Sequence, residues 1–231
     1  MRVVRLMDEP DWQSRLSPIE EIFFATSPSA KTLRPDERQP FKERWLGRYI
    51  AYDIESFFVA ITEIGTVAGY LAGCLDNPAR NPRFADNGYY ASFAPLCDPY
   101  PCHLHINLDE RYRNRGIGSA LIAAFAAQAA SAGRSGIHVV TGERARNVRF
   151  YEKNEFHPLA TAHWNGADMV FMGRRLLTRR RRRRVALQSA SAGVHGLTGA
   201  INRSGAYKIS GAVLLVCREK GVKRWNGTPL Y

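Results

Sequence analysis

The sequence predicts a single mixed α/β domain that is followed by a basic C-terminal segment. Two runs rich in β-branched and aromatic residues, Phe57–Thr62 and Val67–Leu75, flank the turn sequence Glu-Ile-Gly-Thr and indicate a β-hairpin. Residues 103–156 then alternate strand-like and helix-like patterns, and the composition changes after Leu176. A hairpin followed by such an alternation predicts a mixed, mostly antiparallel sheet flanked by helices.

The elements before the hairpin are predicted from the spacing of apolar residues. Residues 2–7 form a short apolar run that predicts a strand. Residues 8–26 begin with acidic side chains and then carry apolar residues at helical spacing, which predicts a helix. Residues 36–53 predict a second helix, which we expect to break near Pro40 because proline has no amide hydrogen to donate.

After the hairpin, residues 76–101 are rich in Asn, Pro, Gly and Tyr and predict a long loop with some local helix. Loops of this length are usually functional or mobile. The later elements are predicted in chain order, namely a strand (103–108), an alanine-rich helix ending at Gly133 (118–133), a buried strand (136–142), a helix (145–156) and two closing strands (157–161 and 168–176).

The net charge of +12 is concentrated at one end of the chain. Residues 177–231 carry +11 of it, including the six consecutive arginines Arg179–Arg184, whereas residues 1–176 carry +1. We therefore expect one domain over residues 1–176 and a disordered basic tail over residues 177–231. Such a tail would bind polyanions weakly and without specificity, and it lacks the interleaved aromatic residues that specific nucleic-acid recognition would need.

The cysteines and the N-terminus predict a cytoplasmic protein without a metal site. Cys74, Cys97, Cys102 and Cys217 show no Cys-x-x-Cys spacing, so zinc binding and dithiol redox chemistry are not expected. Cys97 and Cys102 flank a turn and could approach each other, but reduced thiols are the favoured interpretation. Acidic residues occupy the N-terminus where a signal peptide needs an apolar stretch, and no apolar run is long enough to span a membrane.

The stretch Arg-Tyr-Arg-Asn-Arg-Gly-Ile-Gly-Ser, residues 111–119, carries the clearest chemical signal. It lies between the strand ending at Leu108 and the start of an apolar helix. The first amides of a helix have no intrahelical partner, and glycines let a bulky anion approach them closely. The spacing therefore predicts a phosphate-binding turn. It is not a P-loop, and Leu121 stands where a dinucleotide fingerprint has its third glycine. The alternative is a glycine turn with solvated arginines.

Two longer segments resemble one family. The sequence HLHINLDERYRNRGIGSALI is similar to the acetyl-coenzyme A signature of the GCN5-related N-acetyltransferase (GNAT) family, and GIHVVTGERARNVRFYEKNEFHPL resembles that family's next strand and helix. The resemblance covers residues 103–160 and is closest to a subset like the acetyltransferase-like domain found beside O-GlcNAc hydrolases. It implies the acyl-CoA N-acyltransferase fold, acetyl-CoA as co-substrate and transfer of the acetyl group to a primary amine.

The resemblance also implies a set of site residues. The backbone amides of the glycine turn would hold the coenzyme pyrophosphate, with the charge of its arginines nearby, and the Leu108 N–H would point at the thioester oxygen. Asn147 would hold the coenzyme arm, and Tyr151 would donate a proton to the leaving thiolate. The implied coenzyme-binding residues are Leu108, Arg113, Asn114, Arg115, Gly116, Ile117, Gly118, Ser119 and Asn147.

Each assignment outside the turn has a structural alternative. Tyr151 lies on a helix that faces a sheet, where a tyrosine is often a core residue with a paired hydroxyl. Asn147 stands at the start of the same helix, where it could serve as a cap.

The general base is left open. His103, His105 and Asn107 share one face of their strand by alternation, and either histidine could take a proton near neutral pH. A strand histidine is more often structural, and Asn107 stands where the related subset has an acid. Asp109 and Glu110 are close in sequence but are expected to face solvent.

Three functions remain open on the sequence. The first is an N-acetyltransferase acting on an amine of a small molecule or a protein. The second is a coenzyme-binding protein without catalysis, and the third is a nucleic-acid-associated protein acting through the arginine-rich tail. The acceptor pocket would be built from the first helices and the 76–101 loop, whose aromatic residues suggest a partly apolar cleft (Tyr89, Tyr90, Phe93 and Tyr100).

Overall fold

A computed structural model describes residues 1–176 of the chain. The predicted basic tail, with Arg179–Arg184 and Cys217, lies outside the described residues. Within residues 1–176, no helix is both long and apolar enough to cross a membrane.

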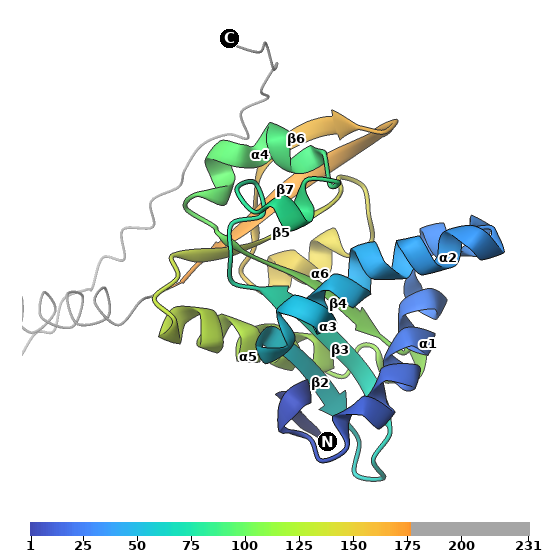
Figure 1. The fold of residues 1–231 in the computed structure, drawn as a ribbon. Coiled ribbons are helices and arrows are strands. Elements are labelled where there is room, and N and C mark those ends of the chain that lie inside the picture. The colour runs from blue at the N-terminus through green and yellow to red at the C-terminus, as the bar shows by residue number, and fades with distance from the viewer. Residues whose placement is uncertain (177–231) are drawn as a thin grey trace, which may run out of the picture.

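The described chain forms one seven-stranded sheet with the strand order β1-β2-β3-β4-β5-β7-β6 (Figure 1). The predicted hairpin is confirmed, because β2 and β3 pair in antiparallel fashion around a turn with Gly65 at a φ of 83°. The strands are β1 (Arg2–Arg5), β2 (Phe57–Ile61), β3 (Val67–Cys74), β4 (Cys102–Leu108), β5 (Gly136–Gly142), β6 (His157–Trp164) and β7 (Ala167–Arg175).

One neighbouring pair of strands departs from the antiparallel pattern. β4 and β5 are parallel, and they pair only through Cys102 with Ile137 and His103 with His138 in the described sheet. Beyond these residues β4 stays paired with β3, and β5 stays paired with β7. The two strands therefore part along the C-terminal half of β4.

The helices cover the two faces of the sheet in two groups (Figure 1). Helices α1 (Leu16–Thr26), α3 (Arg48–Tyr52) and α4 (Tyr89–Cys97) pack on one face, and α2 (Pro35–Lys42) leads into α3. Helices α5 (Ile117–Ser131) and α6 (Val148–Lys153) pack on the other face. The alternation of strand side chains divides β4 accordingly. Cys102 and Leu104 face α5, whereas His103 contacts aromatic rings under α3 and α4.

The second predicted helix differs from its expected form. Pro40 lies inside α2 and does not break it. The irregularity follows three residues later, where Glu43–Gly47 form a π-helical turn before α3 continues. The helix thus runs through the proline and absorbs its disturbance in a widened turn, a feature that is frequent at functional sites.

The segment 76–101 also holds more structure than a loop. Its aromatic residues line the core under α4, where Tyr89, Tyr90, Phe93 and Tyr100 are at most 7% exposed. The expectation that they form an apolar cleft was therefore wrong. Cys97 and Cys102 are buried and not bonded to each other, and burial raises the pKa of each thiol to about 12.

Candidate active site

The gap between β4 and β5 exposes backbone donors of β4, and the last of them is the amide of Leu108. The amide of Asp109 donates to the carbonyl of Ala68 on β3, over 3.0 Å. Backbone amides of an antiparallel strand point alternately to its two sides. The N–H of Leu108 therefore points away from β3 and into the gap, where β5 no longer pairs with β4.

Two neighbours fix the position of Leu108. A Cβ atom on Gly69, opposite Leu108 on β3, would lie 2.7 Å from the carbonyl oxygen of Asn107 and would also collide with the Leu108 side chain. The glycine thus lets the end of β4 lie close against β3. From the other side, the Arg113 Nε donates to the Leu108 carbonyl oxygen over 3.3 Å. The residue implied for pyrophosphate binding therefore also anchors the strand end.

Helix α5 begins directly behind this strand end. Its N-cap, Gly116, has a φ of 76° in the left-handed region, and Asn114 has a φ of 59°. These conformations turn the chain sharply so that Ile117 can open the helix. The amides of its first turn have no intrahelical partner, and the helix dipole makes this end positive.

Gly118 lies where three elements meet. A Cβ atom there would be 2.8 Å from Cζ of Phe150 on α6 and 3.3 Å from Cδ1 of Leu108 on β4. The missing side chain therefore allows α6 to pack against the first turn of α5. It leaves the backbone of that turn uncovered by a side chain of its own. Gly116 has open space around its Cα instead.

The basic side chains of the turn occupy different positions. Arg113 is partly buried against β4, as described above. The Arg115 guanidinium lies over the Tyr112 ring at 5.8 Å, and it belongs to an exposed residue. Arg111 is bound to the Asp109 carboxylate, which holds the pKa of that carboxyl below its usual value. Two of the three arginines, Arg113 and Arg115, thus keep their charge without a carboxylate partner among the described residues.

Asn147 stands at the N-cap of α6, but its side chain makes no cap hydrogen bond. Its Oδ1 instead accepts a hydrogen bond of 3.0 Å from the Thr141 hydroxyl on β5. This bond turns the asparagine toward the end of β5, on the far side of the gap from Leu108. The position agrees with the predicted role at the coenzyme arm, and the capping alternative does not describe the side chain.

Tyr151 is 6% exposed and packs between Phe150 and Phe156. Burial raises the pKa of its hydroxyl, and no hydrogen bond to that hydroxyl is found within residues 1–176. The ring of Tyr151 is therefore part of the core, as the alternative expected, but its hydroxyl is not paired within residues 1–176. A buried phenol with a raised pKa stays protonated near neutral pH.

The two candidate histidines have different surroundings. His103 is 1% exposed, and its Nδ1 lies 3.2 Å from the Tyr49 hydroxyl and 3.4 Å from the Tyr90 hydroxyl. Burial, with the nearby His138, lowers the pKa of His103 well below its usual value. His105 is only partly buried and lies two residues closer to the end of β4. No group of His, Cys, Asp or Glu in the described chain has the arrangement of a metal site.

The three polar residues after the histidines also differ in position. The Asn107 Nδ2 donates to the Tyr70 hydroxyl over 2.7 Å. The Asp109 side chain is 16% exposed and caps a short 3₁₀ turn, so it does not simply face solvent as expected. Glu110 is exposed, as predicted.

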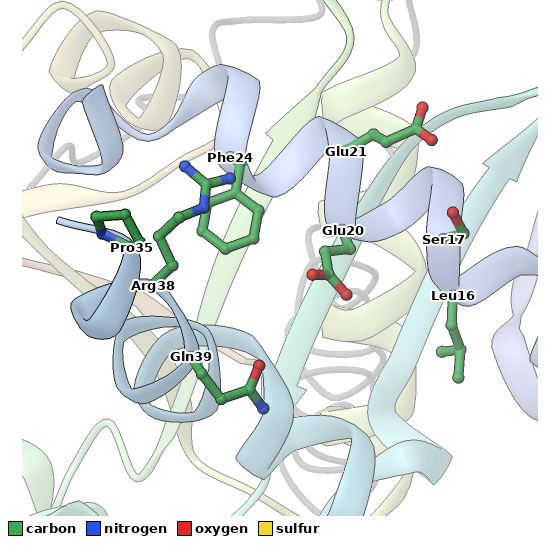
Figure 2. Close-up of a pocket in the computed structure, with 8 residues that line it drawn as sticks. All are labelled: Leu16, Ser17, Glu20, Glu21, Phe24, Pro35, Arg38 and Gln39. Atoms are coloured by element: carbon green, nitrogen blue, oxygen red, sulfur yellow. The ribbon is translucent and has the colours of Figure 1, made fainter. Parts of the chain in front are cut away.

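An open groove of about 720 Å³ runs between α1 and α2. Figure 2 shows Glu20 of α1 and Gln39 of α2 on opposite sides of it, with the Arg38 guanidinium beside the Phe24 ring. Helix α1 packs on β3 and β4, so the groove lies on the sheet face that carries His105 and Asn107. It is lined by Leu16, Ser17, Glu20, Glu21, Phe24, Pro35, Arg38 and Gln39.

Sequence reasoning missed several residues of the site. Phe150 packs against Gly118, and Thr141 donates a hydrogen bond to Asn147. Tyr70 accepts a hydrogen bond from Asn107, and Trp45 lies against His105. Thr141 and Phe150 lie within the second family-like segment but were not singled out there, and Tyr70 and Trp45 stand in no motif. Only the π-helical turn around Trp45, which follows a proline within a helix, carried a local signal.

The parted strands β4 and β5 expose the Leu108 amide beside the N-terminus of α5, where Gly116 is the N-cap. This arrangement is that of an acyltransferase site. The chain belongs to the acetyltransferase (GNAT) family, whose model matches residues 19–156. Acyl transfer is therefore its class of reaction. The predicted fold is confirmed, whereas the resemblance to the domain beside O-GlcNAc hydrolases stays a prediction.

Solved structures agree with this fold. The chain is similar to SsHAT, with a TM-score of 0.58 and 21% identity over 75% of this chain and 97% of that chain. A protein of Pyrococcus horikoshii OT3 matches with a TM-score of 0.53 and 14% identity over 75% and 97% of the two chains. Ribosomal-protein-alanine N-acetyltransferase from Brucella melitensis matches with a TM-score of 0.51 and 16% identity over 76% and 100%.

Proposed function

We propose that the protein transfers an acetyl group from acetyl-CoA to a primary amine. The observation that carries this proposal is the Leu108 N–H, which points into a gap between parted strands directly in front of the α5 N-terminus. A donor at that point stabilises the negative charge that develops on a thioester oxygen during attack. The coenzyme supplies the activated acetyl group.

The chain's own residues fit the coenzyme in two places. The amides of the first turn of α5 and the charges of Arg113 and Arg115 would bind its pyrophosphate. The parted edges of β4 and β5 would accept its extended arm in the position of an additional strand, with Asn147 at the β5 side. Gly116 and Ser119, on either side of the buried Ile117 and Gly118, are exposed, so the backbone of the turn is open to the phosphates at these two positions.

We assign the proton donor and the proton acceptor to residues on opposite faces of the sheet. Tyr151 lies on the α5–α6 face and would give its proton to the leaving sulfur. An amine must then arrive from the opposite face, since the coenzyme is bound from the α5 side. His105 and Asn107 lie on that opposite face, and the groove between α1 and α2 opens there. We assign proton uptake to His105, because His103 is enclosed and already bound to two tyrosines.

Steady-state assays of free-thiol release test this function. Purified full-length protein should release thiol from acetyl-CoA faster when amines are added, and mass spectrometry should find acetylated product. A panel of alkylamines, polyamines and peptides with free N-termini covers small-molecule and protein acceptors. Tight coenzyme binding by calorimetry without amine-dependent release from any of them would favour a coenzyme-binding protein without catalysis.

A further inference from the structure

The imidazole of His105 is held by two aromatic rings from the helix above it. The Trp45 ring lies 5.3 Å from it, centroid to centroid, at an interplanar angle of 83°. The Tyr49 ring lies 5.4 Å from it at 78°. Both contacts are edge-to-face, so the imidazole is held by two aromatic rings that stand nearly perpendicular to it.

The two nitrogens of His105 differ in their surroundings. Nε2 is buried and has no hydrogen-bond partner in the described chain, whereas Nδ1 is not buried in this way. A ring edge that carries N–H is positive and is attracted to an aromatic face, and N–H···π contacts are weak hydrogen bonds. A lone pair pointing at the same rings would be repelled. With the buried Nε2 edge directed toward these rings, the favoured tautomer has hydrogen on Nε2 and the lone pair on Nδ1.

The spacing of Trp45 and Tyr49 along the chain brings both rings to His105. Trp45 lies within the turn Glu43–Gly47, and Tyr49 follows four residues later in α3. The Tyr49 ring is fixed independently, because it is 1% exposed and its hydroxyl is bound to His103. Residues four positions apart lie on the same side of a helix, so both rings reach one imidazole.

We propose that Trp45 is a positioning residue that, together with Tyr49, holds His105 in the Nε2–H tautomer with Nδ1 as the proton acceptor. In the reaction, the amine nitrogen forms the N–C bond of the product while the C–S bond of the thioester breaks and the leaving sulfur takes a proton from Tyr151. One proton passes from the amine nitrogen to Nδ1, and His105 changes from neutral imidazole to imidazolium. The catalytic part of this proposal rests on the proposed acetyl transfer, whereas the tautomer does not.

The charge state of His105 is compatible with this role. Burial, with the Arg48 guanidinium nearby, lowers the pKa of His105 to about 4. The ring is therefore neutral at physiological pH, so its tautomer is a defined property. A neutral ring is also the form that can accept a proton.

Nitrogen-15 NMR of the imidazole rings tests the tautomer in the full-length protein. The His105 signals are assigned by their loss in His105→Gln. In the unsubstituted protein, Nδ1 should resonate as an unprotonated nitrogen and Nε2 as a protonated one. Trp45→Phe, which keeps an aromatic ring, should retain this pattern. Trp45→Leu should shift both resonances toward averaged values, because the tautomers then approach equal populations.

Kinetics provide the second readout, with Trp164→Leu as the matched control. Trp164 is also partly buried and makes an edge-to-face contact, with Tyr89, but far from His105 in the fold. Trp45→Leu should lower kcat roughly tenfold with the KM for acetyl-CoA unchanged, since only part of an acid–base contribution is lost. The control should change neither the spectrum nor kcat.

Three outcomes separate the two proposals. A protonated Nδ1 in the unsubstituted protein, or an unchanged spectrum in Trp45→Leu, would overturn the positioning role. An altered spectrum without any change in kcat would overturn proton uptake by His105. A protein that shows the expected spectra but acetylates no amine would contradict the proposed function and leave the tautomer assignment standing.

Discussion

The side-chain amide of Asn107 donates a 2.7 Å hydrogen bond to the hydroxyl of Tyr70 on the neighbouring strand. Tyr70 is 1% exposed and stacks on Phe57 at 5.4 Å. By the predicted resemblance to one subset of the family, Asn107 occupies the position of an acid, and its amide makes this bond instead. The bond satisfies a buried hydroxyl and fixes the side chain two residues beyond His105.

The first prediction concerns Asn107. Asn107→Leu removes the partner of the buried Tyr70 hydroxyl and should lower the free energy of unfolding by about 1–3 kcal/mol, the cost of an unsatisfied buried polar group. Asn107→Asp should cost less, because the Tyr70 hydroxyl can turn and donate to the carboxylate. Denaturant unfolding measures the stability of both variants. Tyr70→Phe, which removes only the hydroxyl, is the control. Equal stabilities of the Leu and Asp variants would show that the bond contributes nothing.

The second prediction concerns Gly118. Gly118→Ala places a methyl group against Phe150 and should lower stability by about 1–3 kcal/mol, as overpacking does. Adding Phe150→Leu should recover most of that loss by giving the methyl group room. Calorimetry should nevertheless find acetyl-CoA binding weakened in both variants, because the methyl group stays beside the amides of the α5 turn. If the double variant binds as tightly as the parent, Gly118 serves helix packing alone.

The third prediction concerns Tyr151. Tyr151→Phe deletes a hydroxyl that has no partner in residues 1–176, so stability should hardly change while turnover falls roughly 10²-fold, the scale of a general acid. Burial raises the Tyr151 pKa, so the donor form persists across the physiological range. The pH profile of kcat up to about pH 9 should therefore keep its shape in the variant. A variant with lower stability and normal turnover would identify a core residue only.

The elements that could be predicted from the sequence are those whose signals lie within one short segment of the chain. The hairpin was predictable because its turn and both strands lie within one short segment, and β2 and β3 pair as expected. Helix α5 was predictable from its alanine-rich pattern, and Gly133, which follows it, has a φ of 74° as a terminating glycine should. The glycine turn was recognisable because strand, turn and helix are adjacent in the chain.

The features that could not be predicted from the sequence depend on contacts between segments that are far apart along the chain. Pro40 was expected to break a helix, but α2 runs through it and the irregularity follows at the turn Glu43–Gly47. The aromatic residues of α4 have the same composition whether they line a cleft or a core. The contact of Trp45 with His105 joins residues sixty positions apart, and no spacing rule connects them.

The fourth prediction concerns residues 177–231. β7 ends at Arg175, and the N–H of the buried Leu176 donates to the Ser135 carbonyl over 3.0 Å, so a cut after Leu176 leaves the sheet complete. We expect this truncation to remove most binding to heparin, with a steep salt dependence beforehand, because it removes a charge of +11. The melting temperature should stay almost the same. A large decrease would show that the removed segment stabilises the domain.

The last prediction concerns the buried histidines and pH. His103 and His138 are at most 1% exposed, and burial lowers the pKa of both, to about 4 for His138. In the unfolded chain each returns to about 6.5. Between these values the unfolded chain binds protons that the folded chain excludes, so stability must fall as the pH falls from about 6.5 toward 4. Each histidine contributes up to about 1.4 kcal/mol per pH unit over that interval. Urea unfolding at several pH values should show this dependence of stability on pH. His138→Phe should lower the slope by the contribution of one histidine, although it also loses the bond to the Tyr100 carbonyl. The exposed control His157→Gln should not lower the slope in this way. A stability that is flat across this range would mean that His103 and His138 are protonated inside the fold, although each ring lies among aromatic rings.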